Sequence, residues 1–124
     1  MKTRYAVTLS TLVGIAIGAV AIQGLHAQAK PKAYLVSESE VLDATALAPY
    51  TAAIGDVQKA AGGRSFGTRG KVVASVGEAP KRVGISEWDS LEQVQAYLKS
   101  EARKKVGGEK VVKITRQYIV EAGN

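Results

Sequence analysis

Four segments of the chain carry the mixture of apolar and polar positions that is typical of strands with one buried face. They cover residues 33–41, 64–76, 82–88 and 111–121. In the second segment, Gly70 is expected to kink or bulge the backbone, so that a strand over 64–69 continues over 71–76. The pattern therefore predicts a four-stranded sheet.

Two further segments carry the three-to-four-residue repeat of amphipathic helices. The apolar row of the first consists of Leu47, Tyr50, Ile54 and Val57. Asp43 or Thr45 is expected to cap this helix, and Gly62-Gly63 to end it. Because Pro49 has no backbone donor, either the regular helix begins near it or the first turn is distorted.

The second helix is expected to begin at Asp89-Ser90, where either residue can form a capping box with the Glu or Gln three positions later. It is expected to continue through the basic Arg103-Lys104-Lys105 to Gly107-Gly108. The order is then strand, helix, two strands, helix and strand. This order predicts an α+β fold of the ferredoxin-like, split βαβ kind, an antiparallel sheet with two helices on one face.

The N-terminus differs from the rest of the chain. Lys2 and Arg4 precede an uncharged apolar run, which ends in the small residues of Ala27-Gln28-Ala29. These features are typical of a secretory signal peptide. We therefore predict a signal peptide at 1–29 and a single secreted or periplasmic domain at 30–124, with cleavage after Ala29 or after Ala27. After cleavage no membrane contact is expected. An uncleaved anchor is the alternative, since the run approaches the ~20 residues of a spanning helix.

The chain has no cysteine, and its one histidine, His26, lies in the signal region. Thiol chemistry and metal binding by imidazole or thiolate are therefore excluded from the domain, and neither a metal nor another cofactor is expected. The net charge of +6 includes Lys2 and Arg4, and the other basic residues form no long block. Together with export, this argues against nucleic acid as a partner.

A few charged and aromatic side chains remain as candidates for a site. The ligand-binding candidates are Arg69, Arg82, Trp88, Tyr50 and Tyr97, and the catalytic candidate is Glu87. The arginines can hold a carboxylate or a phosphate, although edge-strand charges that prevent aggregation are the simpler explanation. Glu87 can act as a base or form a salt bridge with Arg69 or Arg82. The aromatic rings can stack on a ligand or fill a core or an interface.

Several short motifs together resemble one known family. They are Gly62-Gly63-Arg64 with Phe66, Arg69-Gly70-Lys71, Arg82-Val83, Glu87-Trp88 with Ser90, Tyr97-Leu98-Lys99-Ser100 and Tyr118 to Gly123. From Ala33 to Gly123 the chain resembles the domain-of-unknown-function 1330 family. The resemblance implies a dimeric α+β barrel, in which two subunits join their open sheet faces and can enclose a cavity. It implies no activity. The family's Ser-Pro-x-Tyr reads here Ser100-Glu101-Ala102-Arg103.

We therefore expect an exported homodimer that binds a small organic, anionic molecule in a dimer cavity without catalysis. Apolar residues on both faces of the strands support the dimer, because a large apolar face does not normally stay exposed. A cofactor-independent enzyme on the same fold, such as a monooxygenase or an isomerase, is one alternative. A structural or interaction protein of the cell envelope is the other.

Overall fold

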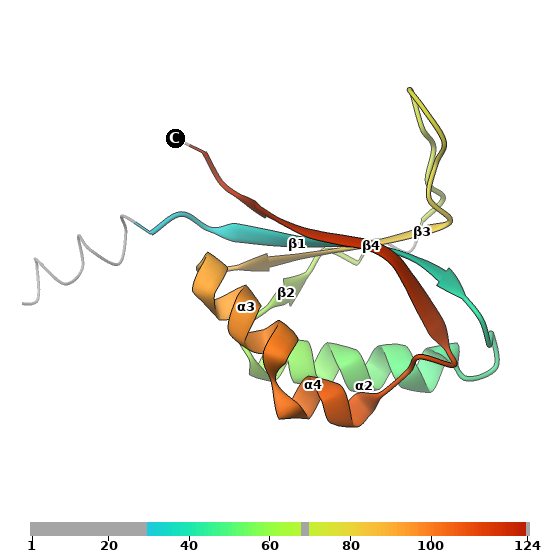
Figure 1. Cartoon of the computed structure of the whole chain (residues 1–124), viewed down its shortest axis with the longest axis horizontal. Coiled ribbons are helices and arrows are strands. Elements are labelled where there is room, and N and C mark those ends of the chain that lie inside the picture. Colours follow the sequence, from blue (N-terminus) through green and yellow to red (C-terminus); the bar gives the residue numbers. More distant parts are fainter. Residues whose placement is uncertain (1–29, 68–69, 124) are drawn as a thin grey trace, which may run out of the picture. The chain divides into compact units, whose positions relative to one another are not determined.

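The computed structural model describes residues 30–67 and 70–123, and Pro31–Asn124 forms one compact unit (Figure 1). The predicted signal peptide and its cleavage site lie outside the described residues. The strands are β1 (Ala33–Val41), β2 (Arg64–Ser65), β3 (Arg82–Trp88) and β4 (Val112–Glu121). They form one antiparallel sheet in the order β2-β3-β1-β4, which confirms the predicted ferredoxin-like arrangement.

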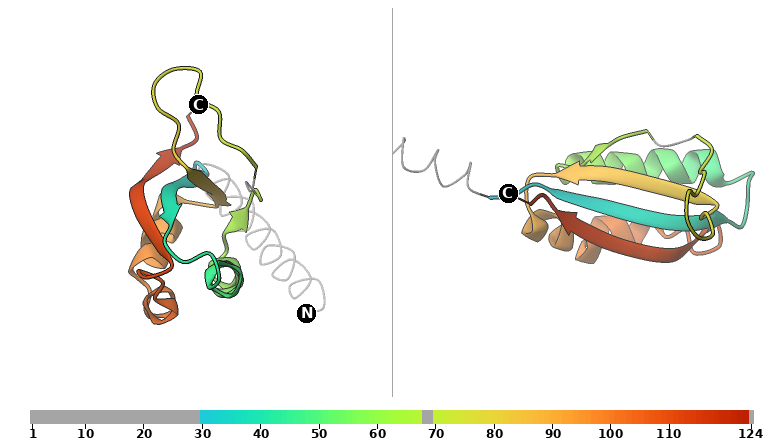
Figure 2. Two further views of the ribbon diagram at one scale, coloured as in Figure 1. Left: turned by 90° about the vertical axis from the view of Figure 1, so that its right-hand side faces the viewer. Right: turned by 90° about the horizontal axis from the view of Figure 1, so that it is seen from above.

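The helices are α2 (Leu47–Ala60), α3 (Leu91–Lys99) and α4 (Glu101–Val106), and all of them lie on one face of the sheet (Figures 1 and 2). The predicted second helix is thus divided in two. Ser100 has an extended backbone (φ −68, ψ 146), and its hydroxyl accepts a hydrogen bond from the Arg103 amide. Ser100 therefore ends α3 and caps α4.

The starts of the helices are set by local hydrogen bonds. Of the two capping boxes that the sequence predicted as alternatives, the structure has a variant of Ser90 with Gln93. The Ser90 hydroxyl accepts from the Gln93 amide, and the Gln93 side chain accepts from the amide of Asp89, one residue before the N-cap. The predicted side-chain cap of α2 is wrong, because Ala46 is its N-cap residue. The Asp43 carboxylate instead binds Thr45 in the turn before the helix.

Pro49 lies in the first turn of α2, where a missing amide donor costs no intrahelical hydrogen bond. The regular helix therefore begins before Pro49 and includes it.

A small buried core joins the sheet to α3. It consists of Ala33, Leu35, Trp88, Val94 and Tyr97. The indole Nε1 of Trp88 donates to the Ser86 hydroxyl at 2.8 Å, and the indole ring lies 4.8 Å from the ring of Tyr97. The core thus occupies the α3 side of the sheet.

The second predicted strand is much shorter than the pattern indicated. Only Arg64–Ser65 pairs with β3, and residues 70–81 contain no strand. The chain there projects from the sheet on the side away from the helices (Figure 1). Val76 is 92% exposed, so this alternating segment does not pack against a neighbouring strand. A strand pattern at a sheet edge forms ladder hydrogen bonds only where a partner strand is present.

Candidate functional site

The most distinctive feature of the domain is a cleft between α2 and the sheet. No residue of α2 is buried, and a cavity of about 180 Å³ lies between this helix and the strands. Beside the apolar Leu35, Ile85, Val112 and Ile114, five of the strand residues beneath α2 are small or polar, and they are Ser37, Ser39, Gly84, Ser86 and Gln117. Such side chains do not fill the space under a helix as an apolar core does. The cleft therefore follows from the composition of the strand centres.

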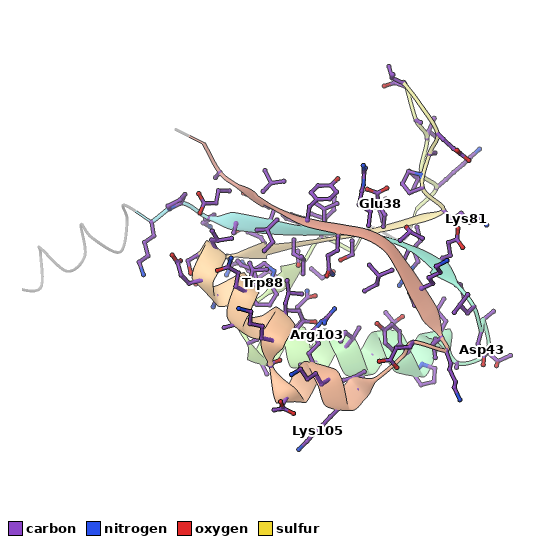
Figure 3. All side chains as sticks on the ribbon, viewed as in Figure 1. Glu38, Asp43, Lys81, Trp88, Arg103 and Lys105 are labelled. Carbon is purple, nitrogen blue, oxygen red and sulfur yellow. The ribbon has the colours of Figure 1, made fainter. Side chains whose placement is uncertain are left out.

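The cleft is lined by two arginines and by no acidic residue among those that the structure describes. Arg82 comes from β3, and Arg103 comes from α4; Figure 3 shows Arg103 between the helices and the sheet. Neither guanidinium forms an ion pair within the described part of the chain. Because guanidinium groups bind carboxylates and phosphates through paired hydrogen bonds, the cleft suits an anion.

Two tyrosines form part of the wall. Burial raises the pKa of Tyr97, and the positive charge of Arg103 offsets only part of this effect. Tyr97 therefore keeps its proton and can serve as a hydrogen-bond donor. Arg103 also lies over the Tyr97 ring, 5.8 Å from its centroid, and donates to the Leu98 carbonyl oxygen at 3.4 Å. These contacts hold the guanidinium against the cleft.

Tyr50 is placed by a close approach to the backbone. A Cβ atom on Gly108 would overlap the Tyr50 ring, so glycine at this position makes room for the aromatic side chain. Gly108 also has a positive φ of 107°, which favours glycine independently. The glycine pair after α4 thus positions a cleft residue as well as ending a helix.

A second, wider opening adjoins the cleft. It has a volume of about 440 Å³ and shares Tyr50, Ile54, Arg103, Val112 and Ile114 with the first. Lys104, Lys113 and Glu109 surround its outer part. Arg103 therefore lies at the junction between an inner cavity and an entrance that is mainly positively charged.

The comparisons with known proteins agree with the fold. The family model described as domain of unknown function DUF1330 matches residues 32–122. The chain belongs to the DUF1330 family. Crystal structures with the same fold include the RPA0582 protein of unknown function from Rhodopseudomonas palustris, at 14% identity and a TM-score of 0.56 over 75% of this chain and 82% of that one. The methylated RPA0582 protein gives 13% identity and a TM-score of 0.57 over 77% and 82% of the two chains. No curated protein matches this sequence.

In the structure of this DUF1330 domain, the predicted site residues do not lie together. Tyr50, Tyr97 and Arg82 line the cleft. Trp88 is fully buried in the core and does not line it. Arg69 lies outside the described residues.

Glu87 lies on the opposite face of the sheet from the cleft. Its carboxylate oxygen is 2.8 Å from Lys32 Nζ and 2.8 Å from Arg64 Nη2, and Arg82 is not among its described partners. These hydrogen bonds lower the pKa of Glu87, so the carboxylate stays ionised and bound to two cations. Such a group makes a poor general base. Within the described residues, no cluster of acidic side chains is arranged to hold a metal ion.

Arg103 is a charged cleft residue that sequence reasoning missed. It belongs to the basic group Arg103-Lys104-Lys105, and the simplest interpretation of such a group is a helix end exposed to solvent. One signal pointed to it: Arg103 occupies the position where the DUF1330 pattern has the tyrosine of Ser-Pro-x-Tyr. A departure from the family pattern thus falls on a residue of the cleft wall.

Proposed function

We propose that this domain, as an exported homodimer, binds a small organic anion in the cleft between α2 and the sheet and does not transform it. The observation that carries the proposal is the charge of the cleft. Arg82 and Arg103 both line it, and none of its described residues is acidic. An anion that enters the cleft therefore gains charge-assisted hydrogen bonds without repulsion from the wall.

The volume of the cleft limits the size of the ligand. A cavity of about 150 Å³ accommodates a benzene molecule. The inner cavity of about 180 Å³ therefore suits a ring or a short chain with one small substituent. Leu35, Ile54 and Tyr97 supply apolar surface for its carbon skeleton. A small carboxylic acid meets both requirements.

Support for the homodimer comes from the face of the sheet that the helices leave uncovered, here named the open face. Tyr34, Val36, Ile85, Tyr118 and Val120 belong to it. The Phe66 ring is stacked on Tyr34 with 6.2 Å between the centroids, and Val120 is 47% exposed. The face also carries Glu38, Glu87 and Arg116, whose charges are paired. Exposed apolar side chains of this kind mark an interface, and a second copy of the chain would cover them.

The predicted dimer cavity and the observed cleft lie on different faces of the sheet. The sequence placed ligand binding between the open faces of two subunits. We instead place the ligand in the cleft within one subunit, because Arg82 and Arg103 both line it. Export rests on the features of residues 1–29 alone.

Calorimetric titration of the mature protein tests anion binding. Benzoate and hexanoate are compared with benzamide and hexanamide, which have nearly the same shape but no charge. We expect the acids to bind and the amides not to. Because hydrogen bonds to charged groups contribute roughly 1.5–3 kcal/mol, Arg103→Gln should weaken binding of the acids roughly 10- to 100-fold.

Lys105→Gln is the matched control, since it removes one positive charge from the same helix at an exposed position outside the cleft. It should leave the affinity nearly unchanged. Equal binding of acids and amides, or equal losses in the two variants, would show that the cleft does not select anions.

A further inference from the structure

The ladder between the inner strand β1 and the edge strand β4 is irregular at the cleft. Glu38 of β1 pairs with Arg116 of β4, whereas the next residue, Ser39, pairs with Ile114. Thr115 is therefore an extra residue on β4, and its hydroxyl donates to the Glu38 carbonyl oxygen at 3.0 Å. Bulges of this kind redirect side chains and occur often beside binding sites. Here the bulge lies at the position from which Ser39 faces the cleft.

Ser39 is a buried polar residue without a partner in the described part of the protein. It is 5% exposed and lines the cleft, and its hydroxyl makes no hydrogen bond to another described residue. The neighbouring serines differ. Ser86 accepts from Trp88 Nε1, and Ser37 accepts from Gln117 Nε2, each at 2.8 Å. No fully buried side-chain polar atom of the described residues lacks a hydrogen-bond partner, so the unbonded Ser39 hydroxyl is accessible from the cleft and available to a molecule there.

Arg82 is the direct neighbour of Ser39 across the β1–β3 ladder. Both residues line the cleft, and Arg82 has no ion-pair partner among the residues that the structure describes. The adjacent Lys81, in contrast, lies 3.8 Å from Glu40. A hydroxyl donor beside a guanidinium fork is a suitable arrangement for a carboxylate, whose oxygens accept from both.

The two arginines reach the cleft from opposite sides. Arg82 belongs to β3 of the sheet. Arg103 belongs to α4 in the helical layer, and Figure 3 shows it between the helices and the sheet. A ligand with one carboxylate pairs with only one of these groups. Building on the proposed function, we infer that the ligand is a small dicarboxylate. One carboxylate binds Ser39 and Arg82, and the other binds Arg103.

The inference is tested by calorimetry on the mature protein with succinate, glutarate and adipate, each compared with its monoamide. One of these diacids should be long enough to reach both Arg82 and Arg103. Wild type should bind that diacid at least 10-fold more tightly than its monoamide. Arg82→Gln should abolish this preference and retain binding of the monoamide through Arg103. Lys81→Gln, which changes the neighbouring charge outside the inner cavity, should retain the preference.

Ser39→Ala separates a ligand-binding role from a structural one. The Ser39 hydroxyl of wild type has no hydrogen-bond partner among the described residues, so its removal should not lower the melting temperature without ligand. The affinity for the diacid should fall roughly 10-fold. Ser90→Ala is the matched control, because it removes the hydroxyl that caps α3 and does not line the cleft. It should lower the melting temperature and leave the preference for the diacid.

Two results overturn the inference in distinguishable ways. Equal affinity of wild type for diacid and monoamide at every chain length excludes the dicarboxylate and leaves anion binding intact. Failure of every acid, benzoate and hexanoate included, to bind refutes both the inference and the proposed function.

Discussion

Gly63, just after α2, lies against the buried indole of Trp88. A Cβ atom at position 63 would be 2.5 Å from Trp88 Cζ2, 2.8 Å from Trp88 Cε2 and 2.8 Å from Gln58 Cγ. The indole has little freedom to retreat, because Trp88 is fully buried, donates to Ser86 and packs on the Tyr97 ring. We therefore predict that Gly63→Ala overpacks the core and destabilises the domain.

The size of the effect follows from these distances. Non-bonded carbon atoms prefer a separation of about 3.5–4.0 Å, so the indole or the backbone at Gly63 must move by about 1 Å. Overpacking of this kind costs roughly 1–3 kcal/mol. For a domain of this size, each kcal/mol lowers the melting temperature by roughly 4–8 °C. The Gly63→Ala domain should therefore melt between roughly 4 and 24 °C below wild type.

Gly55→Ala is the matched control. Gly55 lies inside α2, and a Cβ atom there would meet nothing within 4 Å. Alanine in place of glycine within a helix should stabilise the domain by roughly 0.5–1 kcal/mol. Thermal unfolding is followed by circular dichroism at one protein concentration, because dimerisation would shift the melting temperature with concentration. A Gly63→Ala melting temperature equal to that of wild type would refute the close contact with Trp88.

Three further predictions concern the dimer, the response to acid and the N-terminus. Val120→Glu on the open face should convert the dimer to a monomer in sedimentation at micromolar concentration, while Ala53→Glu on the exposed side of α2 should not; a folded wild-type monomer would contradict the dimer. The pKa of Glu87 is lowered in the folded state, so its stabilising contribution is present above its ordinary value of 4.5 and is lost as the pH falls through the lowered pKa. Glu87→Gln should therefore reduce the loss of stability below pH 4.5 in urea unfolding, and an unchanged pH dependence would contradict this role. Intact mass of the secreted protein should show a chain beginning at Gln28 or Lys30, whereas a membrane-bound chain that keeps its first residue would indicate an anchor.

The sequence alone predicted the elements that local physics determines. The strands over 33–41 and 82–88 were identified with these bounds, because alternation along a strand is itself the signal for its two faces. The start of α3 was predicted from Ser90 and Gln93, since a capping box needs only residues close in sequence. The order of the elements then limited the topology to few choices, and the ferredoxin-like arrangement was among them.

The site required the tertiary structure. Tyr50, Tyr97 and Arg82 were candidates by residue type, but only packing shows that they line one cleft while Trp88 fills the core. Arg103 looked like a solvated charge, because the sequence does not show which way a short helix faces.

The cleft itself depends on residues that are far apart in the chain. It exists because short polar side chains on β1 and β3 lie opposite a helix with no buried residue. Local patterns determine which face of a strand or helix is apolar, but whether two such faces meet and fill the space between them is decided only when the chain is folded.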